Sequence, residues 1–220
     1  MARFAPVGPI QVLEGLLAHG SRTFGDYHLL LAHHTVEHKA RFTDLFKRLT
    51  DKHWKGTVIM DNSIVELGSA VDTDMIIEAT NIIVENCPDA AVYPVLPDIM
   101  GKGYETIDEI NQVYGSWELE MPGEGFMAVV QGSSLGEFYE VLEVLGDKDL
   151  YRDINVLGIP RYLVETTGSR VRPMLKAKNY IGSHQIHMLG FSDDVRDDLD
   201  AAAIIPSCSD RDWETVVSTR

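Results

Sequence analysis

The sequence contains few cysteines and no long apolar segment. Its 220 residues include only Cys87 and Cys208, which cannot form a CxxC pair. A disulfide framework and a cysteine-rich zinc site are therefore excluded. No stretch approaches the roughly 20 apolar residues that span a bilayer, and the first residues lack the apolar run of a secretory signal. We expect a cytoplasmic protein with no membrane partner.

Positive charge is also scarce, because 19 basic residues stand against 34 acidic ones and give a formal net charge of -15. Such a chain cannot coat nucleic acid through charge alone. Several cations nevertheless share one segment, where only Glu165 opposes them: Arg161, Arg170, Arg172, Lys176 and Lys178. This basic strip is either a solvated surface or a local phosphate contact, and composition does not separate the two.

Short apolar runs rich in β-branched residues recur along the chain and predict eight strands. These strands are expected at residues 4–7, 28–32, 57–60, 91–96, 126–130, 155–159, 186–189 and 199–205. Amphipathic helical patterns lie between them at residues 10–18, 36–49, 73–85, 104–114, 135–145 and 168–179, and residues 210–220 are expected to supply part of a last helix.

Alternating strands and helices indicate a parallel sheet, and eight such units favour closure into a barrel. We therefore predict an α/β fold, a compact (β/α)8 TIM barrel in a single domain spanning residues 1–220, with one or two helices missing or irregular. A doubly wound open sheet is the alternative. No GxGxxG or GxxxxGK[ST] string opens a helix, which argues against a dinucleotide or nucleoside triphosphate site.

Polar residues follow several predicted strands, where the loops of a barrel would meet. Among them are Asp61 with Ser63, Asp98, Gln131 with Gly132, Arg161 beyond Gly158, and Asp200. A single aspartate in such a place is often a helix cap or a turn residue. Three carboxylates around one mouth favour acid–base or nucleophilic chemistry, because shared surroundings separate their pKa values.

Three histidines near the second predicted strand, His33, His34 and His38, raise the question of a metal site. His34 and His38 are one helical turn apart, but no HExxH-type glutamate accompanies them. We expect capping or surface roles for them and no bound metal.

Four short strings at these strand ends resemble motifs of the tRNA-guanine transglycosylase superfamily. The strings are Met60-Asp61-Asn62-Ser63-Ile64-Val65-Glu66-Leu67-Gly68, Val130-Gln131-Gly132-Ser133, Leu157-Gly158-Ile159-Pro160-Arg161 and His187-Met188-Leu189-Gly190. They most closely resemble the short viral branch of that superfamily, which exchanges guanine for a 7-deazaguanine in DNA, and they follow one another in order on successive predicted strand ends. The resemblance spans nearly the whole chain and, for a viral protein, implies the cytoplasm of a host cell.

The resemblance implies a base-exchange glycosyltransferase, a pentosyltransferase that replaces guanine in nucleic acid with a free 7-deazaguanine such as preQ0. Asp61 would be the general acid/base and Asp200 the stand-in for the covalent nucleophile, although the family's Gly-hydrophobic-Asp string is absent there. Asp98, Gln131, Gly132, Gly158 and Ser63 would hold the base, and Arg161, Arg170, Arg172, Lys176 and Lys178 would contact the phosphate backbone. The tRNA enzymes of the family hold a zinc ion with three closely spaced cysteines and a histidine, which this chain lacks. Because that zinc element helps to grip tRNA, its absence implies no cofactor and favours DNA over tRNA as the partner.

Two other functions remain open from the residues alone. One is a small-molecule TIM-barrel lyase or hydrolase that uses the same mouth, although the predicted strands carry no lysine and no His-x-His pair follows the first one. The other is a non-catalytic module that binds a deazapurine or nucleic acid. The sequence does not decide whether the chain acts as a homodimer or with a partner protein.

Overall fold

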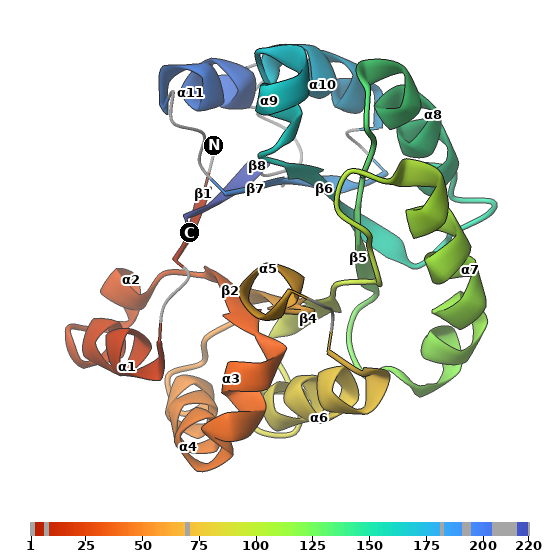
Figure 1. The fold of residues 1–220 in the computed structure, drawn as a ribbon. Helices are drawn as coiled ribbons and strands as arrows, with labels where there is room; N and C mark the ends of the chain where they lie inside the picture. The colour runs from red at the N-terminus through yellow and green to blue at the C-terminus, as the bar shows by residue number, and fades with distance from the viewer. Residues whose placement is uncertain are drawn as a thin grey trace. The chain divides into compact units, whose positions relative to one another are not determined.

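The structure is a computed structural model that describes residues 3–6, 9–68, 71–180, 183–190, 195–203 and 215–219. Strands and helices alternate along the chain (Figure 1). The strands are β1 (Arg3–Pro6), β2 (Tyr27–Leu31), β3 (Thr57–Asp61), β4 (Ala91–Pro94), β5 (Phe126–Val129), β6 (Ile154–Pro160), β7 (Gln185–Leu189) and β8 (Thr215–Thr219). The helices are α1 (Ile10–Ala18), α2 (Ser21–Phe24), α3 (Ala32–Glu37), α4 (Lys39–Thr50), α5 (Ile64–Leu67), α6 (Thr73–Val84), α7 (Gly103–Glu120), α8 (Leu135–Leu145), α9 (Leu163–Thr167), α10 (Val171–Ala177) and α11 (Val195–Ala203), with a 3-10 turn at Lys178–Tyr180.

The chain divides into two compact units, which are described separately. The first unit comprises Met1–Ala5, Leu96–Gly115 and Phe126–Arg220, and the second comprises Pro6–Val95 and Ser116–Gly125.

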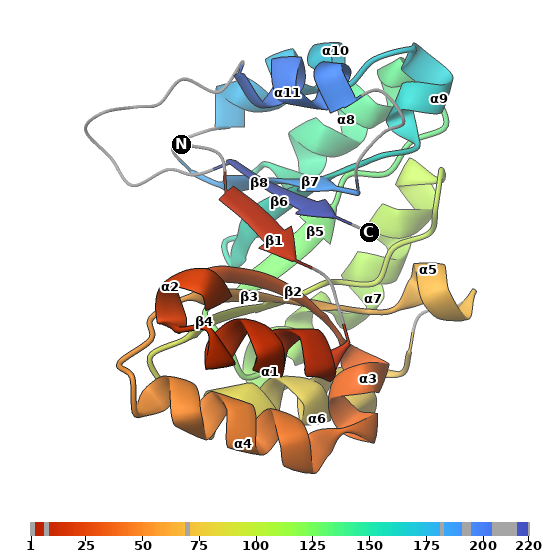
Figure 2. The ribbon, with the colours of Figure 1, turned by 90° about the vertical axis from the view of Figure 1, so that its left-hand side faces the viewer.

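In the second unit, three parallel strands form a sheet in the order β2-β3-β4. Leu31 is the register partner of Asp61, so β2 and β3 end side by side. Helices α1, α4 and α6 lie along one face of this sheet (Figure 2). Helix α6 begins where the Asp72 side chain accepts a hydrogen bond of 2.8 Å from the Met75 amide. It buries an apolar stripe that includes Ile76 and Ile83.

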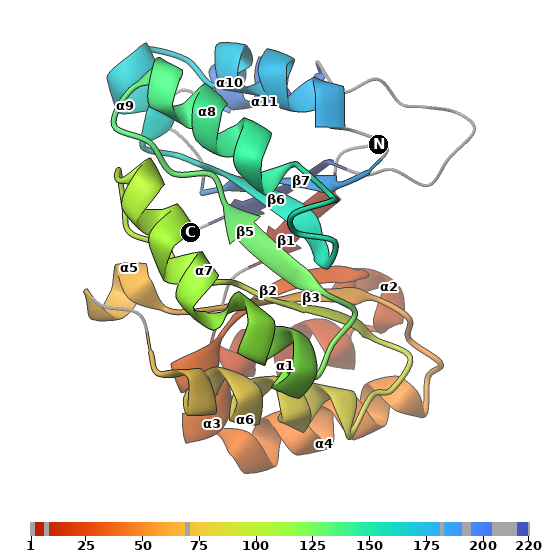
Figure 3. The ribbon, with the colours of Figure 1, turned by 90° about the vertical axis from the view of Figure 1, so that its right-hand side faces the viewer.

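In the first unit, five strands form a sheet in the order β1-β8-β7-β6-β5, and the strands from β5 to β8 pair in parallel. Helices α8, α10 and α11 lie along one of its faces (Figures 1 and 2). Figure 3 shows α7 running beside β5, where the Tyr114 ring meets the Phe126 ring edge-on with centroids 5.9 Å apart. A hypothetical Cβ on Gly158 would lie 2.4 Å from Met127 Cε, so this glycine makes room for core packing between β5 and β6.

The parallel α/β architecture predicted from the sequence is confirmed, and the first seven predicted strands overlap β1 to β7. The eighth prediction is wrong. The segment predicted as a strand at residues 199–205 begins inside helix α11, while Ile204 and Ile205 lie outside the described residues. The strand β8 instead occupies Thr215–Thr219, where we expected part of a helix.

Among the helices that the structure describes, none combines the length and the apolar character that crossing a membrane requires.

Candidate functional site

A buried carboxylate and a buried amide meet in the first unit, in the segments that follow β4 and β5 in the chain. Asp98 is 7% exposed and Gln131 is 3% exposed. The Leu96 amide donates to the Met127 carbonyl at 2.9 Å, and this bond aligns the segment that carries Asp98 with β5. Gln131 Nε2 donates to Asp98 Oδ2 at 2.5 Å, and the Gly101 amide donates to Gln131 Oε1 at 3.0 Å. These two bonds fix which end of the Gln131 amide faces the carboxylate.

A tyrosine that sequence reasoning missed is bonded to the residue after Gln131. Tyr162 follows β6, and its hydroxyl donates to the Gly132 carbonyl at 3.0 Å while accepting from the Gly132 amide at 2.8 Å. Burial, together with the charges of Asp98 and Glu137, raises the pKa of Tyr162 to about 12. The phenol is therefore protonated at neutral pH. The only signal in the sequence was its place directly after Arg161, at the end of a predicted strand.

A glutamate in the first turn of α8, also missed from the sequence, connects two of the loops at this site. Glu137 accepts hydrogen bonds from the Gly103 amide at 2.7 Å, the Ser133 amide at 2.8 Å and the Ser133 hydroxyl at 2.5 Å. The Ser133 hydroxyl bond is the largest cause that lowers the pKa of Glu137. The Ser134-x-x-Glu137 spacing is typical of a capping box, and Ser134 Oγ does accept from the Glu137 amide at 3.2 Å.

A second polar cluster lies at the carboxyl end of β3, in the second unit. Asp61 is 5% exposed, and its Oδ1 accepts a 2.7 Å hydrogen bond from the Ser63 amide. Asn62 Oδ1 accepts from the Ile64 amide at 3.2 Å. Ser63 is fully buried and has a φ of 63°, a left-handed conformation that costs a non-glycine residue roughly 1–2 kcal/mol. The fold therefore holds Asp61 at the strand end through a strained turn.

Gly158 and Gly132, which were expected to hold the base, bond to other groups of the protein. The Gly158 carbonyl accepts the Val130 amide at 2.9 Å within the β5–β6 region. The Gly132 amide and carbonyl are bonded to Tyr162, and a Cβ on Gly132 would lie 2.7 Å from the Phe138 backbone nitrogen. Both glycines are thus required by packing.

Asp200 does not lie at a strand end. It is exposed on helix α11. The apolar residues around it satisfy a helical pattern, which the short segment did not distinguish from a strand.

The basic strip is not a continuous exposed surface, because one of its five members is buried. Arg170 is fully buried, and its Nη1 lies 3.2 Å from Oδ1 of Asp198, which is also buried. A buried guanidinium cannot contact a phosphate backbone, so this assignment is wrong. Lys176 forms an ion pair of 2.7 Å with Glu143. The other three members, Arg161, Arg172 and Lys178, are exposed.

The three histidines form a row of ring contacts without a metal-binding arrangement. The centroids of His33 and His34 are 4.3 Å apart, and those of His34 and His38 are 6.3 Å apart. Within the described ranges, no group of three or more His, Cys, Asp or Glu side chains is arranged to hold a metal ion.

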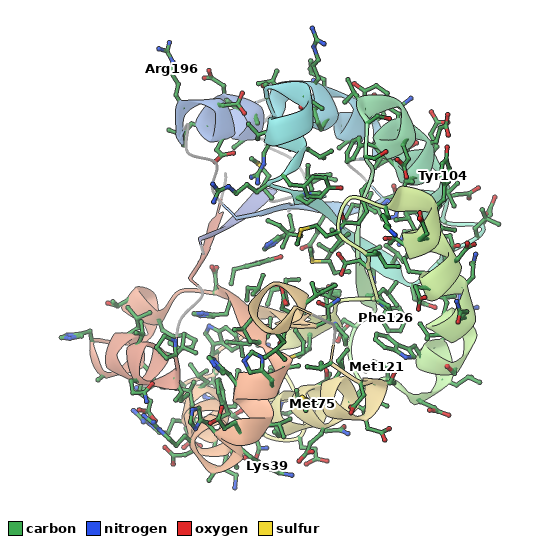
Figure 4. All side chains as sticks on the ribbon, in the orientation of Figure 1. Lys39, Met75, Tyr104, Met121, Phe126 and Arg196 are labelled. Atoms are coloured by element: carbon green, nitrogen blue, oxygen red, sulfur yellow. The ribbon has the colours of Figure 1, made fainter. Side chains whose placement is uncertain are left out.

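A surface hollow of about 490 Å³ lies in the second unit between α4 and α6. Its lining includes Lys39, labelled in Figure 4, and Glu78, which form an ion pair of 2.9 Å. The lining comes from two covering helices rather than from strand ends, where the chemistry of parallel α/β folds is concentrated. We therefore place the candidate site at Asp98 and Gln131.

Comparisons with known proteins identify the fold but no family. No protein-family model matches the chain, and no curated protein matches it. Solved structures that are similar in fold include the following two. Dihydrodipicolinate synthase from Agrobacterium tumefaciens matches with a TM-score of 0.58 and 11% identity, over 99% of this chain and 70% of that chain. An HpcH/HpaI aldolase from Desulfitobacterium hafniense matches with a TM-score of 0.52 and 10% identity, over 99% of this chain and 86% of that chain.

These findings correct the assignment to the transglycosylases. The structural neighbours are a synthase and an aldolase rather than a base-exchange glycosyltransferase, and no family model supports the four short strings. Asp200, which was expected to be the nucleophile, lies on helix α11 and not at the end of a strand. What the chain shares with its structural neighbours is an α/β fold of the TIM-barrel kind.

Proposed function

We propose that the chain is a small-molecule lyase of the aldol type, folded as a (β/α)8 barrel over residues 1–220, with Asp98 as its general base. The observation that carries this proposal is the buried Asp98–Gln131 pair beside the Tyr162 phenol. The similarity to an aldolase fold over 99% of the chain supports the reaction class. The position of the pair beyond the strand ends supports its role, because barrel enzymes place their chemistry there.

An aldol cleavage needs a base at the substrate hydroxyl. Asp98 accepts that proton, and the electron pair of the O–H bond forms the carbonyl of the departing fragment as the C–C bond breaks. The electrons of the C–C bond pass to the neighbouring carbonyl and give an enolate. Asp98 then returns its proton to the enolate carbon, so that protons and electrons balance.

The enolate oxygen needs hydrogen-bond donors in a buried site. An amide nitrogen carries two hydrogens, and Gln131 Nε2 gives one of them to Asp98. The second is directed to the substrate oxygen in this proposal. Tyr162 remains protonated because its pKa is about 12, and it holds the Gly132 backbone that forms the wall of the site.

A Schiff-base mechanism requires a lysine nucleophile. None of the residues in the eight strands is a lysine. Acid–base chemistry by the side chains at the strand ends therefore fits this chain better than a strand-borne lysine nucleophile.

The proposal is tested by proton exchange, since any enolate-forming enzyme exchanges the hydrogens next to a carbonyl with solvent. The protein is incubated in D₂O with a panel of small 2-oxo acids, ketones and aldehydes, and loss of the adjacent C–H signal is followed by ¹H NMR. We expect exchange with at least one probe and a fall of about 100-fold or more in Asp98→Asn. Asp149→Asn, at an exposed aspartate of the same unit, serves as the control and should exchange at the wild-type rate.

Two results contradict the proposal. One is the absence of exchange across the whole panel with folded wild-type protein. The other is full exchange in Asp98→Asn, which would remove this carboxylate from the chemistry.

A further inference from the structure

Two loops of the candidate site are joined through one side chain, Glu137. The loop of residues 99–103 supplies the Gly101 amide that orients Gln131. It leads into Gly103, the first residue of α7, whose amide donates to Glu137 Oε1. The loop after β5 ends at Ser133, whose amide and hydroxyl both donate to Glu137 Oε2. One carboxylate thus receives three donors from the two loops.

We propose that Glu137 is a positioning residue that holds the loop of residues 99–103 against the loop after β5 and so keeps Gly101, Gln131 and Asp98 in register. This inference rests on the proposed function of the Asp98–Gln131 pair. Glu137 acts through backbone groups, and the substrate does not contact it.

The packing around Gly103 explains why the loop of residues 99–103 is sensitive to the position of Glu137. A Cβ on Gly103 would lie 2.8 Å from the Gln131 carbonyl oxygen and 3.0 Å from Glu137 Oε1. The loop is therefore in close contact with both residues, and a glycine permits that approach. A movement of the Glu137 carboxylate would therefore displace Gly103, which packs against the Gln131 backbone.

The charge of Glu137 strengthens the arrangement. Hydrogen bonds to an ionised acceptor are shorter and stronger than those between neutral groups. The pKa of Glu137 is lowered, first by the Ser133 hydroxyl and then also by backbone bonds from Ser133 and Gly103. The carboxylate is therefore ionised at neutral pH, and the three donors are held by a full negative charge at the N-terminal turn of α8.

The loop also has a neighbouring attachment that provides a matched control. Tyr104, labelled in Figure 4 on the first turn of α7, donates its hydroxyl to Glu140, one turn further along α8. Both side chains of this contact are exposed. Glu140 is a glutamate on the same helix that contacts α7 but none of the donors at residues 101, 103 and 133.

The test measures hydrogen exchange at the Gly101 amide by ¹⁵N–¹H NMR, because this group bonds to Gln131 and not to Glu137. In Glu137→Gln we expect its protection factor at pH 7 to fall about tenfold, while Glu140→Gln keeps the wild-type value. Unchanged protection at Gly101 in Glu137→Gln would overturn the inference. The readout needs no substrate, so it stands even if the lyase activity is absent.

A second variant changes the titration of Glu137 without removing it. Ser133→Ala deletes the hydroxyl that most lowers the pKa of Glu137, so the carboxylate should protonate at a higher pH. We expect Gly101 protection to be lost on acidification at a higher pH in Ser133→Ala than in the wild type, and the acid limb of kcat to move in the same direction. Identical pH profiles would show that the Glu137 charge is not what holds the loop.

Discussion

His28 is a buried aromatic residue on β2, and its imidazole is 1% exposed. Its ring packs against Phe24 at 4.1 Å and Trp54 at 5.9 Å between centroids. Burial lowers the pKa of His28 to about 4, although the Asp26 charge opposes this shift. His184, in the other unit, is also buried, and desolvation lowers its pKa to about 4.

Because the folded-state pKa of His28 lies below the value of 6.5 for an ordinary histidine, the unfolded chain binds a proton first as the pH falls. The contribution of uncharged His28 to the free energy of unfolding is therefore complete above pH 6.5. That free energy falls by roughly 3 kcal/mol as the pH drops toward 4. We expect His28→Phe to remove that loss while keeping the ring packing. Urea unfolding of both proteins between pH 7 and pH 4.5 should show a shallower decline for the variant.

The exposed His19 provides the control for this measurement. His19→Gln should decline with the wild-type slope. A wild-type slope in His28→Phe would mean that the buried imidazole is already protonated in the folded protein, which its surroundings oppose.

Single residues show which parts of the site were accessible from the sequence. Asp98 and Gln131 were identified because they follow apolar runs, and parallel strands bring such positions to one edge. Tyr162 and Glu137 were missed because their roles come from hydrogen bonds to backbone groups about 30 residues away. Arg170 was assigned to the surface because its partners, Asp197 and Asp198, lie in another helix, and a charge pattern read locally does not reveal them.

At the scale of secondary structure elements, the apolar periodicity was sufficient for most of the fold. Helices α1 and α8 were predicted with their observed bounds, and the first seven strands were located within a few residues. The C-terminal region failed for a local reason. The sequence of α11 combines aspartates in its first turn with a run of alanines, both typical of helices. The β-branched run Thr215–Thr219 carried the strand signal that we assigned to a helix.

The junction of α10 and α11 depends on a buried ion pair. Arg170, at the N-terminus of α10, is fully buried, and its Nη2 donates to the Leu189 carbonyl at the end of β7 at 2.5 Å. Asp198 of α11 is 1% exposed. Desolvation lowers the pKa of Arg170 to about 10, against the opposing charge of Asp198. The guanidinium is thus charged at neutral pH and requires its partner.

Removing one member of this pair should cost more than removing both. We expect Arg170→Met to destabilise the protein by about 3–5 kcal/mol, because Asp198 is left buried without its counter-charge. The double variant Arg170→Met/Asp198→Leu should recover part of that loss. Urea unfolding of the single and double variants measures the difference, with Arg172→Met on the exposed face of α10 as the control. A double variant that is no more stable than Arg170→Met would contradict this account.

At the scale of the whole molecule, the turns that follow parallel strands explain why the family assignment failed. Parallel α/β proteins place Gly, Asp and Asn after their strands, because the turns and helix starts there favour these residues. Short strings that contain them, such as Gln131-Gly132-Ser133 or Asp61-Asn62-Ser63, are therefore expected in unrelated parallel α/β proteins. Their order along the chain therefore follows from the architecture. The parallel α/β architecture could be predicted from this pattern, whereas the reaction could not.

The topology also gives the C-terminal strand a central position. β8 lies between β1 and β7 in the five-stranded sheet, and Met188 of β7 is the register partner of Val217. Proline cannot donate to a strand ladder and is confined to sheet edges. We expect Val217→Pro to cost ~3 kcal/mol or more, comparable to proline inside a helix, and to lower the melting temperature by about 6–12 °C. Val217→Ile, which keeps the β-branched side chain, should melt within about 2 °C of the wild type. Thermal unfolding followed by circular dichroism measures both. Equal melting temperatures for Val217→Pro and the wild type would mean that β8 contributes no ladder bonds to the sheet and that β1 and β7 are edge strands.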